Sequence, residues 1–329
     1  MHKNSSILSK KILYWYDNNK RDLPWRIKCS SKKKEYFTLV SEFMLQQTQV
    51  KTVIPYFKKF IRNFPNIKSL SEASENKLIK NWEGLGYYSR VKNLKKTSKI
   101  IVKKYSKRLP NNIDDLKKLP GIGEYTSQAI LAIAFNKPFI PLDGNIERII
   151  KRLLNLKSKK EINKNNIILK KSFLGTSERS SDYAQALMEL GALVCKPKNP
   201  LCESCPVIKD CISYRKKDFN IVVKNKKKIN KFFIVKIFIK KNKILLIKNQ
   251  KFSFLKNLKI FPMEEISEPK NFNKFLNFKM SNMNMNIIIK VTKVQKKIKN
   301  SIWIEKNKYN NYILPTFTKK IFYSLNKYL

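Results

Sequence analysis

The sequence predicts an all-α region from the N-terminus to about Asp218 and a smaller α+β domain after it. In the first region apolar residues recur at helical spacing, and prolines interrupt them at loop-like intervals. After Asp218 the apolar residues gather into short runs that are typical of strands. The expected division is residues 1–218, a basic linker at 219–230 and a second domain at 231–329. A chain of 329 residues is long enough for two domains, each with its own core.

Shared apolar faces predict the helices of the first region. On an amphipathic helix, apolar residues three and four positions apart lie on one face, which packs against the core. Prolines such as Pro65 and Pro110 leave helices of ordinary length between them. Three of the faces are Leu8, Ile12 and Trp15; Val53, Phe57, Phe60, Ile61 and Phe64; and Val91, Leu94, Ser98, Ile101 and Tyr105.

Short apolar runs predict the strands of the second domain. FFIVKIFI and ILLI lie on either side of KKNK, which is typical of two strands joined by a tight turn. Further strands are predicted for IIIKVTKV near residue 290 and SIWI near residue 302. A closing helix is predicted from the shared face of Phe317, Ile321, Leu325 and Tyr328.

Composition narrows the possible chemistry. The net charge of +48 favours a polyanionic partner, and nucleic acid is the obvious one. An AT-biased coding sequence, rich in Lys, Asn and Ile codons, is an alternative cause of this charge. Because His2 is the only histidine, Ser-His-Asp hydrolysis and His-ligated zinc are not expected. The chain lacks both a membrane-length apolar run and a secretory signal, so a cytoplasmic protein without a membrane partner is expected.

Four of the five cysteines form a compact group. Cys195, Cys202, Cys205 and Cys211 are spaced C-x6-C-x2-C-x5-C, close enough for four thiolates to meet at one centre. In a reducing compartment this pattern favours a metal over disulfides. Zinc with four thiolate ligands is one candidate. Zinc ribbons usually have two C-x2-C pairs and this chain has one, so a 4Fe-4S cluster is preferred. Cys29 lies outside the group and is expected to be an ordinary packed residue.

The segment LPGIG at residues 119–123 predicts a hairpin between two helices. Gly121 and Gly123 allow a tight turn, and the backbone N–H groups of such a turn can bind a phosphate. A plain helix–helix turn is the alternative. Asp143, in PLDGN, precedes the next helix, where it could act simply as an N-cap.

Glu42 is a carboxylate within the otherwise apolar segment FTLVSEFMLQQTQV. Burial would raise its pKa and keep a proton available near neutral pH. A paired or exposed glutamate at a helix edge is the alternative. The QQTQ run after it suits hydrogen bonds to base edges, or a solvated helix face. Tyr87 and Tyr88 in GLGYYSR could enter a base stack or pack in a core.

Together and in this order, these motifs resemble the helix-hairpin-helix DNA glycosylases with an iron–sulfur loop, specifically the adenine DNA glycosylases (MutY type). The similar blocks are LPWR, SEFMLQQTQV, TVIPYF, GLGYYSR, LPGIG, LDGN and MELGALVC with the four cysteines, over about residues 8–214. The resemblance implies a monomeric base excision repair enzyme with one 4Fe-4S cluster held by residues 195–211. Its expected partner is double-stranded DNA in which adenine is mispaired with 8-oxoguanine or guanine.

The resemblance also implies roles for individual residues. Glu42 would be the general acid that protonates the departing adenine, and Asp143 would stabilise the oxocarbenium-like sugar or trap it covalently. Asn145 and Tyr125 would support these carboxylates by hydrogen bonding. The residues expected to contact DNA are Trp25, Arg26 and Gln185 in the adenine pocket, Gln47 and Tyr87 in the base stack, and Gly121 and Gly123 at a phosphate.

Two alternatives differ in their catalytic residues. An endonuclease III-like glycosylase/lyase shares the hairpin, the aspartate and the cysteine spacing, but its Schiff base needs a lysine where this chain has Tyr125. A DNA-binding iron–sulfur protein without catalysis is the second alternative. The presence of both Glu42 and Asp143 counts against it.

The C-terminal part resembles the Nudix-like domain of this family only in LKIFP, Trp303 and the closing helix. That domain ordinarily recognises 8-oxoguanine with Ser, His and aromatic residues, whereas the matching stretch here is the lysine-rich IIIKVTKVQKKI. The glycine-rich turn expected before LKIFP is SFLKN, which changes the backbone conformations allowed there. Because lysine binds phosphate without reading a base, weaker discrimination of 8-oxoguanine from guanine is expected.

Overall fold

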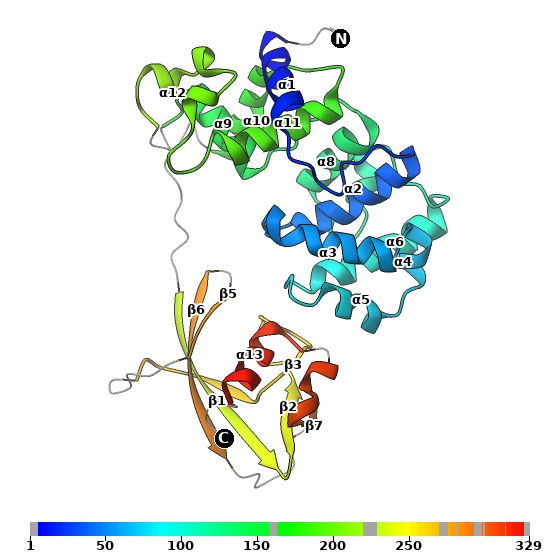
Figure 1. Cartoon of the computed structure of the whole chain (residues 1–329), viewed down its shortest axis with the longest axis vertical. Coiled ribbons are helices and arrows are strands. Elements are labelled where there is room, and N and C mark those ends of the chain that lie inside the picture. Colours follow the sequence, from blue (N-terminus) through cyan, green and yellow to red (C-terminus); the bar gives the residue numbers. More distant parts are fainter. Residues whose placement is uncertain are drawn as a thin grey trace. The chain divides into compact units, whose positions relative to one another are not determined.

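The computed structural model of the chain describes two compact units (Figure 1). One consists of residues 1–73 and 89–223, and the other of residues 74–88 and 224–329. His2, Tyr328 and most of the predicted linker lie outside the described residues. The described residues are 6–157, 163–219, 229–269, 276–280, 282–292, 298, 300–312 and 314–325.

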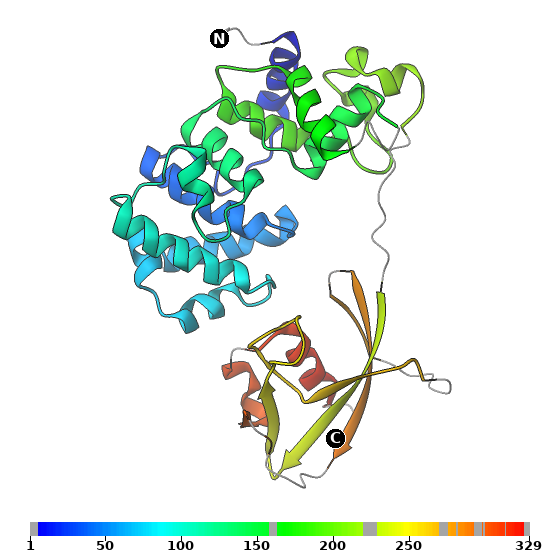
Figure 2. The ribbon, with the colours of Figure 1, turned by 180° about the vertical axis from the view of Figure 1, so that it is seen from behind.

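The first unit is built from helices, as predicted (Figure 2). The helices predicted from the apolar faces are present as α1, α3 and α6. The helix α5 (Glu75–Trp82) belongs to the second unit. The helices of the first unit are α1 (Ile7–Asn19), α2 (Ser31–Leu45), α3 (Val50–Asn63), α4 (Ile67–Glu72), α6 (Ser89–Lys104), α7 (Ile113–Lys117), α8 (Glu124–Phe135), α9 (Gly144–Leu153), α10 (Lys164–Lys170), α11 (Ser180–Leu193) and α12 (Ile212–Arg215).

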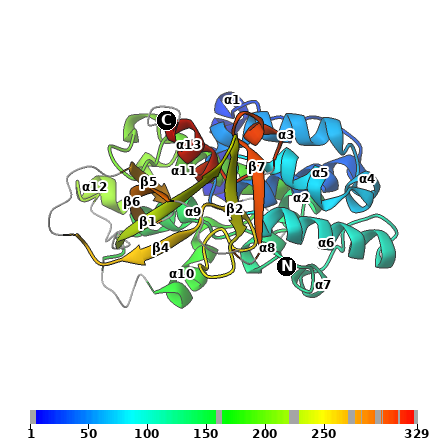
Figure 3. The same cartoon turned by 90° about the horizontal axis from the view of Figure 1, so that it is seen from below.

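The second unit contains a strongly bent sheet and the closing helix α13 (Thr316–Leu325). The order of its main path is β3-β2-β1-β6-β5, while β4 pairs with β1 and β7 pairs with β2. Figure 3 shows β7 beside β2. The strands are β1 (Ile229–Lys240), β2 (Lys243–Lys248), β3 (Lys259–Ile260), β4 (Met263–Ile266), β5 (Leu276–Met280), β6 (Met283–Thr292) and β7 (Ser301–Glu305).

The predicted hairpin between β1 and β2 is confirmed, with Ile239 opposite Ile244. β1 also runs parallel to β6, and the core residues of the sheet pack against Phe317 and Ile321 of α13. The strand β5 was not predicted from the sequence. In its sequence, LNFKM, apolar and polar side chains alternate, and all of them are half-buried or exposed. The apolar signal for a strand is therefore weak.

The turn before LKIFP keeps left-handed backbone without glycine. Leu255 has φ +51° and Asn257 has φ +64°. Asparagine tolerates this region, whereas leucine is strained in it. The buried Asn249 holds the turn, because its Nδ2 donates to the carbonyl oxygens of Phe252 (3.2 Å) and Phe254 (2.6 Å).

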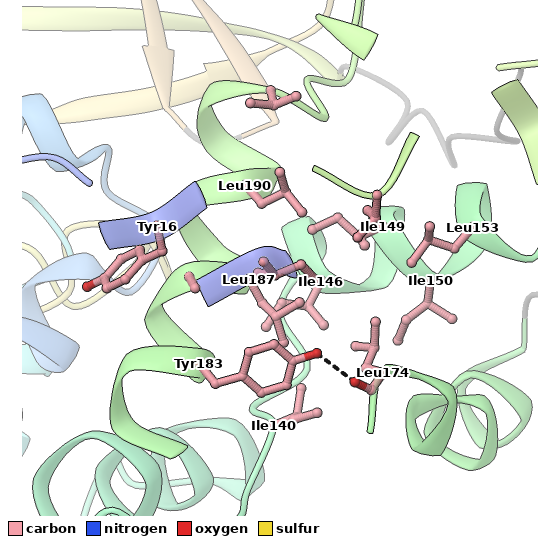
Figure 4. Packing of buried hydrophobic residues seen from close by; sticks show 14 of the residues in the cluster. Tyr16, Ile140, Ile146, Ile149, Ile150, Leu153, Leu174, Tyr183, Leu187 and Leu190 are labelled. Carbon is pink, nitrogen blue, oxygen red and sulfur yellow. Dashed lines mark hydrogen bonds between the residues drawn. The ribbon is translucent and has the colours of Figure 1, made fainter. Parts of the chain in front are cut away.

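In the first unit, α1 shares one core with later helices. Tyr16 of α1 packs in the same cluster as Ile146 of α9 and Leu187 of α11 (Figure 4). The hydroxyl of Tyr183 donates to the Leu174 carbonyl oxygen at 2.6 Å and closes the edge of this cluster. The core thereby fixes α9 and α11, which carry several of the predicted site residues.

The helix α2 is buried over most of its length. It contacts α3, α6 and α8, and every residue from Glu35 to Met44 is buried. Glu42 therefore lies in the most enclosed part of this unit. In the described part of the chain, none of the helices combines the length and the apolar character that crossing a membrane requires.

Candidate active site

Seven of the eleven predicted catalytic and DNA-binding residues line one cavity of the first unit. Its volume is about 200 Å³, and its walls come from α2, α8, α11, the starts of α3 and α9, and the loop between α1 and α2. We call it the inner pocket. The predicted residues in its lining are Trp25, Arg26, Glu42, Tyr125, Asp143, Asn145 and Gln185.

Glu42 is the buried acid of the inner pocket. Its residue is 5% exposed. Burial, together with the nearby negative charge of Asp143, raises its pKa to about 7, although a hydrogen bond from Tyr125 and the charge of Arg26 oppose the shift. At neutral pH a substantial fraction of Glu42 therefore carries the proton that a general acid must donate.

Asp143 is both the N-cap of α9 and a wall of the inner pocket. Its Oδ1 accepts from the backbone N–H groups of Asn145 (2.9 Å) and Ile146 (2.7 Å), and its Oδ2 accepts from Asn145 Nδ2 at 3.0 Å. Burial raises its pKa, and these three hydrogen bonds oppose the shift. Asp143 therefore does act as an N-cap, and the capping hydrogen bonds hold its carboxylate at the pocket.

Gly191 makes room for Asn145. A Cβ atom at Gly191 would lie 2.5 Å from Asn145 Cβ, closer than real side chains approach. The glycine in MELGALVC therefore permits α11 to pack against the start of α9. The orientation of the Asn145 amide toward Asp143 depends on this close approach.

Tyr125 is held as a hydrogen-bond donor in the second position of α8. Burial and the charges of Glu42 and Asp143 raise the pKa of its phenol well above the ordinary value. Its proton is therefore retained at all physiological pH values. No lysine lines the inner pocket among the residues that the structure describes.

Two charged residues of the pocket, Glu189 and Arg21, were not predicted from the sequence. Glu189 is 1% exposed and accepts from Arg21 Nε (2.7 Å) and Nη2 (2.8 Å), and it pairs with Arg26 Nη2 at 3.0 Å. Burial opposes its ionisation, but the hydrogen bonds and charges of the two arginines outweigh burial and lower its pKa. The sequence did contain a signal for Glu189, because it is an acid within the apolar segment YAQALMELGALV. The same kind of signal indicated Glu42.

The predicted hairpin lies between α7 and α8. Gly121 has φ +84°, and a Cβ atom there would lie 2.8 Å from a ring carbon of Phe43. Gly123 is the N-cap residue of α8. Gln46 Nε2 donates to the Gly121 carbonyl oxygen (3.2 Å) and to Thr126 Oγ1 (3.4 Å), which ties the end of α2 to the hairpin.

The two predicted base-stack residues lie in different units. Gln47 follows α2, is exposed and has φ +57°. Arg90 supports this end of α2, because its Nη1 donates to the carbonyl oxygens of Met44 (2.7 Å) and Gln46 (2.5 Å). Tyr87 is 45% exposed with φ +48° and belongs to the segment grouped with the second unit. It is therefore not one of the residues that the first unit brings together.

The four predicted cysteine ligands line a second, largely apolar cavity near α9 and α12. The cavity also contacts Ile149, Leu153 and Arg152. Burial raises the pKa of Cys205 to about 12. All five cysteines of the chain are free of disulfides. In the described residues, no three Cys, His, Asp or Glu side chains converge closely enough to hold a single metal ion.

Two arginines of α9 connect this cysteine loop to its surroundings. Arg148 donates from Nε to the Cys195 carbonyl oxygen (2.7 Å) and from Nη2 to Asn145 Oδ1 (2.8 Å). Arg152 lies with Nη1 3.4 Å from Cys195 Sγ. A continuous chain of hydrogen bonds therefore runs from Asp143 through Asn145 and Arg148 to the loop.

Comparison with known proteins gives consistent results. Residues 40–172 match the family described as HhH-GPD superfamily base excision DNA repair protein. An adenine DNA glycosylase of Buchnera aphidicola subsp. Schizaphis graminum is 39% identical over 78% of this chain and 74% of its own length. The adenine DNA glycosylase of Buchnera aphidicola subsp. Baizongia pistaciae is 38% identical over 96% and 90%.

A solved structure of a thermostable thymine-DNA glycosylase is also similar. It has a TM-score of 0.57 and 27% identity, and the match covers 64% of this chain and 96% of that one. The helical fold predicted from the sequence is therefore shared with a DNA glycosylase. The matched family model and the two extensive sequence matches lead to one conclusion: this chain belongs to the adenine DNA glycosylase family.

Proposed function

We propose that the chain hydrolyses the N-glycosidic bond of adenine mispaired in double-stranded DNA, as a base excision repair glycosylase without lyase activity. The observation that carries the proposal is the inner pocket. It joins a buried carboxyl whose pKa is about 7 with a second carboxylate fixed at a helix N-terminus. Two carboxyl groups in such different environments suit an acid and an electrostatic stabiliser.

In the proposed mechanism the target adenine leaves the base stack and enters the inner pocket. Trp25 and Gln185 line the space for the base, and Arg26 Nε and Nη1, which have no partner among the described residues, offer donors to ring nitrogens. Gln47 fills the stack. Gly121 and Gly123 expose backbone N–H groups to a phosphate.

Glu42 then donates its proton to the adenine, which turns a poor leaving group into a neutral base. The carboxylate of Asp143 stabilises the positive charge that develops on the sugar. Alternatively, a carboxylate oxygen bonds to the sugar, and water later hydrolyses this adduct. Tyr125 and Asn145 hold the two carboxyl groups through hydrogen bonds.

A single-turnover assay on duplexes with adenine opposite 8-oxoguanine, guanine or thymine tests the proposal. Adenine release from the two mispairs, with an intact strand until alkali is added, is the expected result. Efficient borohydride trapping of a Schiff base would support the lyase alternative. Binding without any base release would support the non-catalytic alternative.

The cleavage rate is expected to fall as pH rises through about 7. Burial raises the pKa of Glu42 to about 7, so the protonated acid is the majority form below that value and the minority form above it. Single-turnover rates measured from pH 5.5 to 9 at constant ionic strength report this. A rate that stays flat through pH 9 would contradict the assignment of Glu42 as the acid.

We further propose that Cys195, Cys202, Cys205 and Cys211 hold a 4Fe-4S cluster. They fit such a group because four thiols without disulfides line one largely apolar cavity, and their spacing has only one of the two C-x2-C pairs that are usual in zinc ribbons. When bound, such a cluster would cross-link the loop and supply a redox-active centre. Arg148 and Arg152 then position the loop against α9.

Protein prepared without oxygen is expected to contain iron and sulfide in equal amounts. Cys205→Ser should lower both, whereas Cys29→Ser, which changes the cysteine outside the group, should leave both unchanged. Metal and acid-labile sulfide analysis with the visible absorption spectrum measures this. One zinc per chain with no sulfide would overturn the proposal.

Residues 231–329 are proposed to be a Nudix-like domain that has lost most of its lesion recognition. Lys290 and the exposed Val291 and Thr292 end β6 in the stretch that matches the recognition loop, of which residues 293–297 lie outside the described part. Lys290 suits phosphate and Val291 has no polar group, so this end of β6 offers little that could recognise a modified base edge. The proposed boundaries are those expected from the sequence, with catalysis in residues 1–218.

The enzyme is therefore expected to favour adenine opposite 8-oxoguanine over adenine opposite guanine only weakly, by about tenfold or less, which is about 1.4 kcal/mol. Single-turnover rates on the two duplexes are compared for the full chain and for a chain ending at Asp218. If the shorter chain still cleaves adenine opposite guanine, its catalytic part is folded, so this rate is the control. A large preference that disappears on truncation would contradict the expectation.

A further inference from the structure

Another cavity, larger than the inner pocket and distinct from the cavity of the cysteines, adjoins the inner pocket. We call it the rear cleft; its volume is about 840 Å³. Its lining includes Lys34, Ile54, Lys58 and Asp182, which do not line the inner pocket. The two cavities share part of their walls. The shared residues are Arg21, Leu23, Trp25, Arg26, Ile133 and Gln185.

The helix α2 shows that the two cavities lie end to end. Its first turn contributes Lys34 to the rear cleft, and its last turn contributes Leu45 to the inner pocket. Eleven residues of helix separate these positions, which is roughly 16 Å along the axis. α11 runs in the same sense, from Asp182 at the rear cleft to Ala192 at the inner pocket.

Two other helices run in the opposite sense and give the same order. α3 contributes Val50 at its start to the inner pocket and Lys58 further along to the rear cleft. α8 contributes Tyr125, its second residue, to the inner pocket and reaches the shared wall at Ile133. Four helices therefore agree that the cavities follow one another between them.

The end occupied by the inner pocket is the one that faces DNA in the proposed mechanism. The hairpin at Gly121 immediately precedes α8, and Gln46 at the end of α2 is bonded to it. The rear cleft lies at the opposite ends of these same helices. In that mechanism, a DNA duplex bound at the hairpin end would close the inner pocket and leave the rear cleft open.

We propose that the rear cleft is the exit for free adenine while product DNA remains bound. The inference rests on the proposed function, because a released base is the occupant. A neutral purine suits this route: it would pass Leu23 and Trp25, which offer apolar and aromatic surface, and then enter a wider space. No covalent step is involved.

The shared wall can open without breaking a helix. Leu23, Trp25 and Arg26 belong to the loop between α1 and α2, which has neither helix nor strand structure. In the proposed route a rotation of Trp25, whose ring packs edge-on against Phe57 at 5.2 Å between centroids, would join the two cavities while Arg26 stays paired with Glu189. Gln185 and Ile133, in contrast, are fixed on helices and form the stationary side of the wall.

Obstruction of the rear cleft, away from the catalytic residues, tests the proposal. Ile54→Trp places a large ring in the cleft from α3, and Lys59→Trp, at an exposed position that lines neither cavity, is the matched control. Cys29, at the cleft, gives an independent obstruction through a bulky maleimide, with Cys29→Ser treated in the same way as its control.

Two quantities are measured on radiolabelled duplex: the single-turnover cleavage rate, and the rate at which labelled adenine separates from the enzyme while the product DNA stays bound. Both obstructions should leave cleavage within about twofold and slow adenine separation by roughly tenfold or more. The proposal is overturned if adenine separates at the control rate, or if separation slows only in parallel with cleavage. Absence of cleavage in the unmodified protein would instead refute the proposed function.

Discussion

Glu42→Gln is expected to lower the single-turnover rate of adenine excision by about a hundred- to ten-thousand-fold, the usual contribution of a general acid. The amide has the size of the carboxyl and still accepts the hydrogen bond from Tyr125. It has no proton of suitable acidity to give to the leaving base. The rate should also lose its dependence on pH near 7.

The same substitution is expected to stabilise the protein at high pH. The pKa of Glu42 is raised from 4.5 to about 7 on folding, so the folded state keeps a proton that the unfolded state releases between these values. Wild-type stability therefore falls as pH rises through this window. Above pH 7, Glu42→Gln should be more stable by up to about 3 kcal/mol. Urea unfolding at pH 4.5 and pH 8 measures the difference.

The combination of lost activity and gained stability distinguishes a buried acid from a structural residue. Loss of a structural partner would lower activity and stability together. Ser41→Ala, a change at the neighbouring buried hydroxyl of α2, is the control for disturbance of the helix. If Glu42→Gln cleaves at the wild-type rate, Glu42 is not the acid.

The helical architecture could be predicted because its signals are local. The faces of α3 and α6 repeat apolar residues at helical spacing, and the glycines of the hairpin mark a turn that a side chain at Gly121 would block. The strand β5 gave no such signal, since its stability comes from pairing with β6 along the sheet and not from its own apolar residues.

The pocket was only partly predictable, for a related reason. Glu42 and Asp143 stand out in their segments, but Glu189 acquires its charged state from Arg21 and Arg26, which precede it by more than 160 positions. Sequence spacing says nothing about such a pairing. The rear cleft likewise depends on how four helices lie relative to one another, and no local pattern encodes it.

Asp143→Asn is expected to lower the cleavage rate by about a hundred- to thousand-fold while the protein remains folded. Asparagine caps helices as well as aspartate does, so Oδ1 can still accept from the N–H groups of Asn145 and Ile146. The negative charge that opposes the sugar cation is lost. The new amide nitrogen would face Asn145 Nδ2, which donates to Oδ2 in the wild type, and this cost opposes the gain from no longer burying a charge, so the thermal midpoint should change little.

Asp143→Ala separates the two roles of this residue. It removes both the cap and the charge, so it should match Asp143→Asn in lost activity but also lose about 1 kcal/mol of stability, the usual cost of an absent N-cap. Circular dichroism melting curves and single-turnover rates of the three proteins give the comparison. If Asp143→Asn cleaved normally and only Asp143→Ala were impaired, the carboxylate would serve α9 alone, and the stabilisation of the sugar would have to come from another group of the inner pocket.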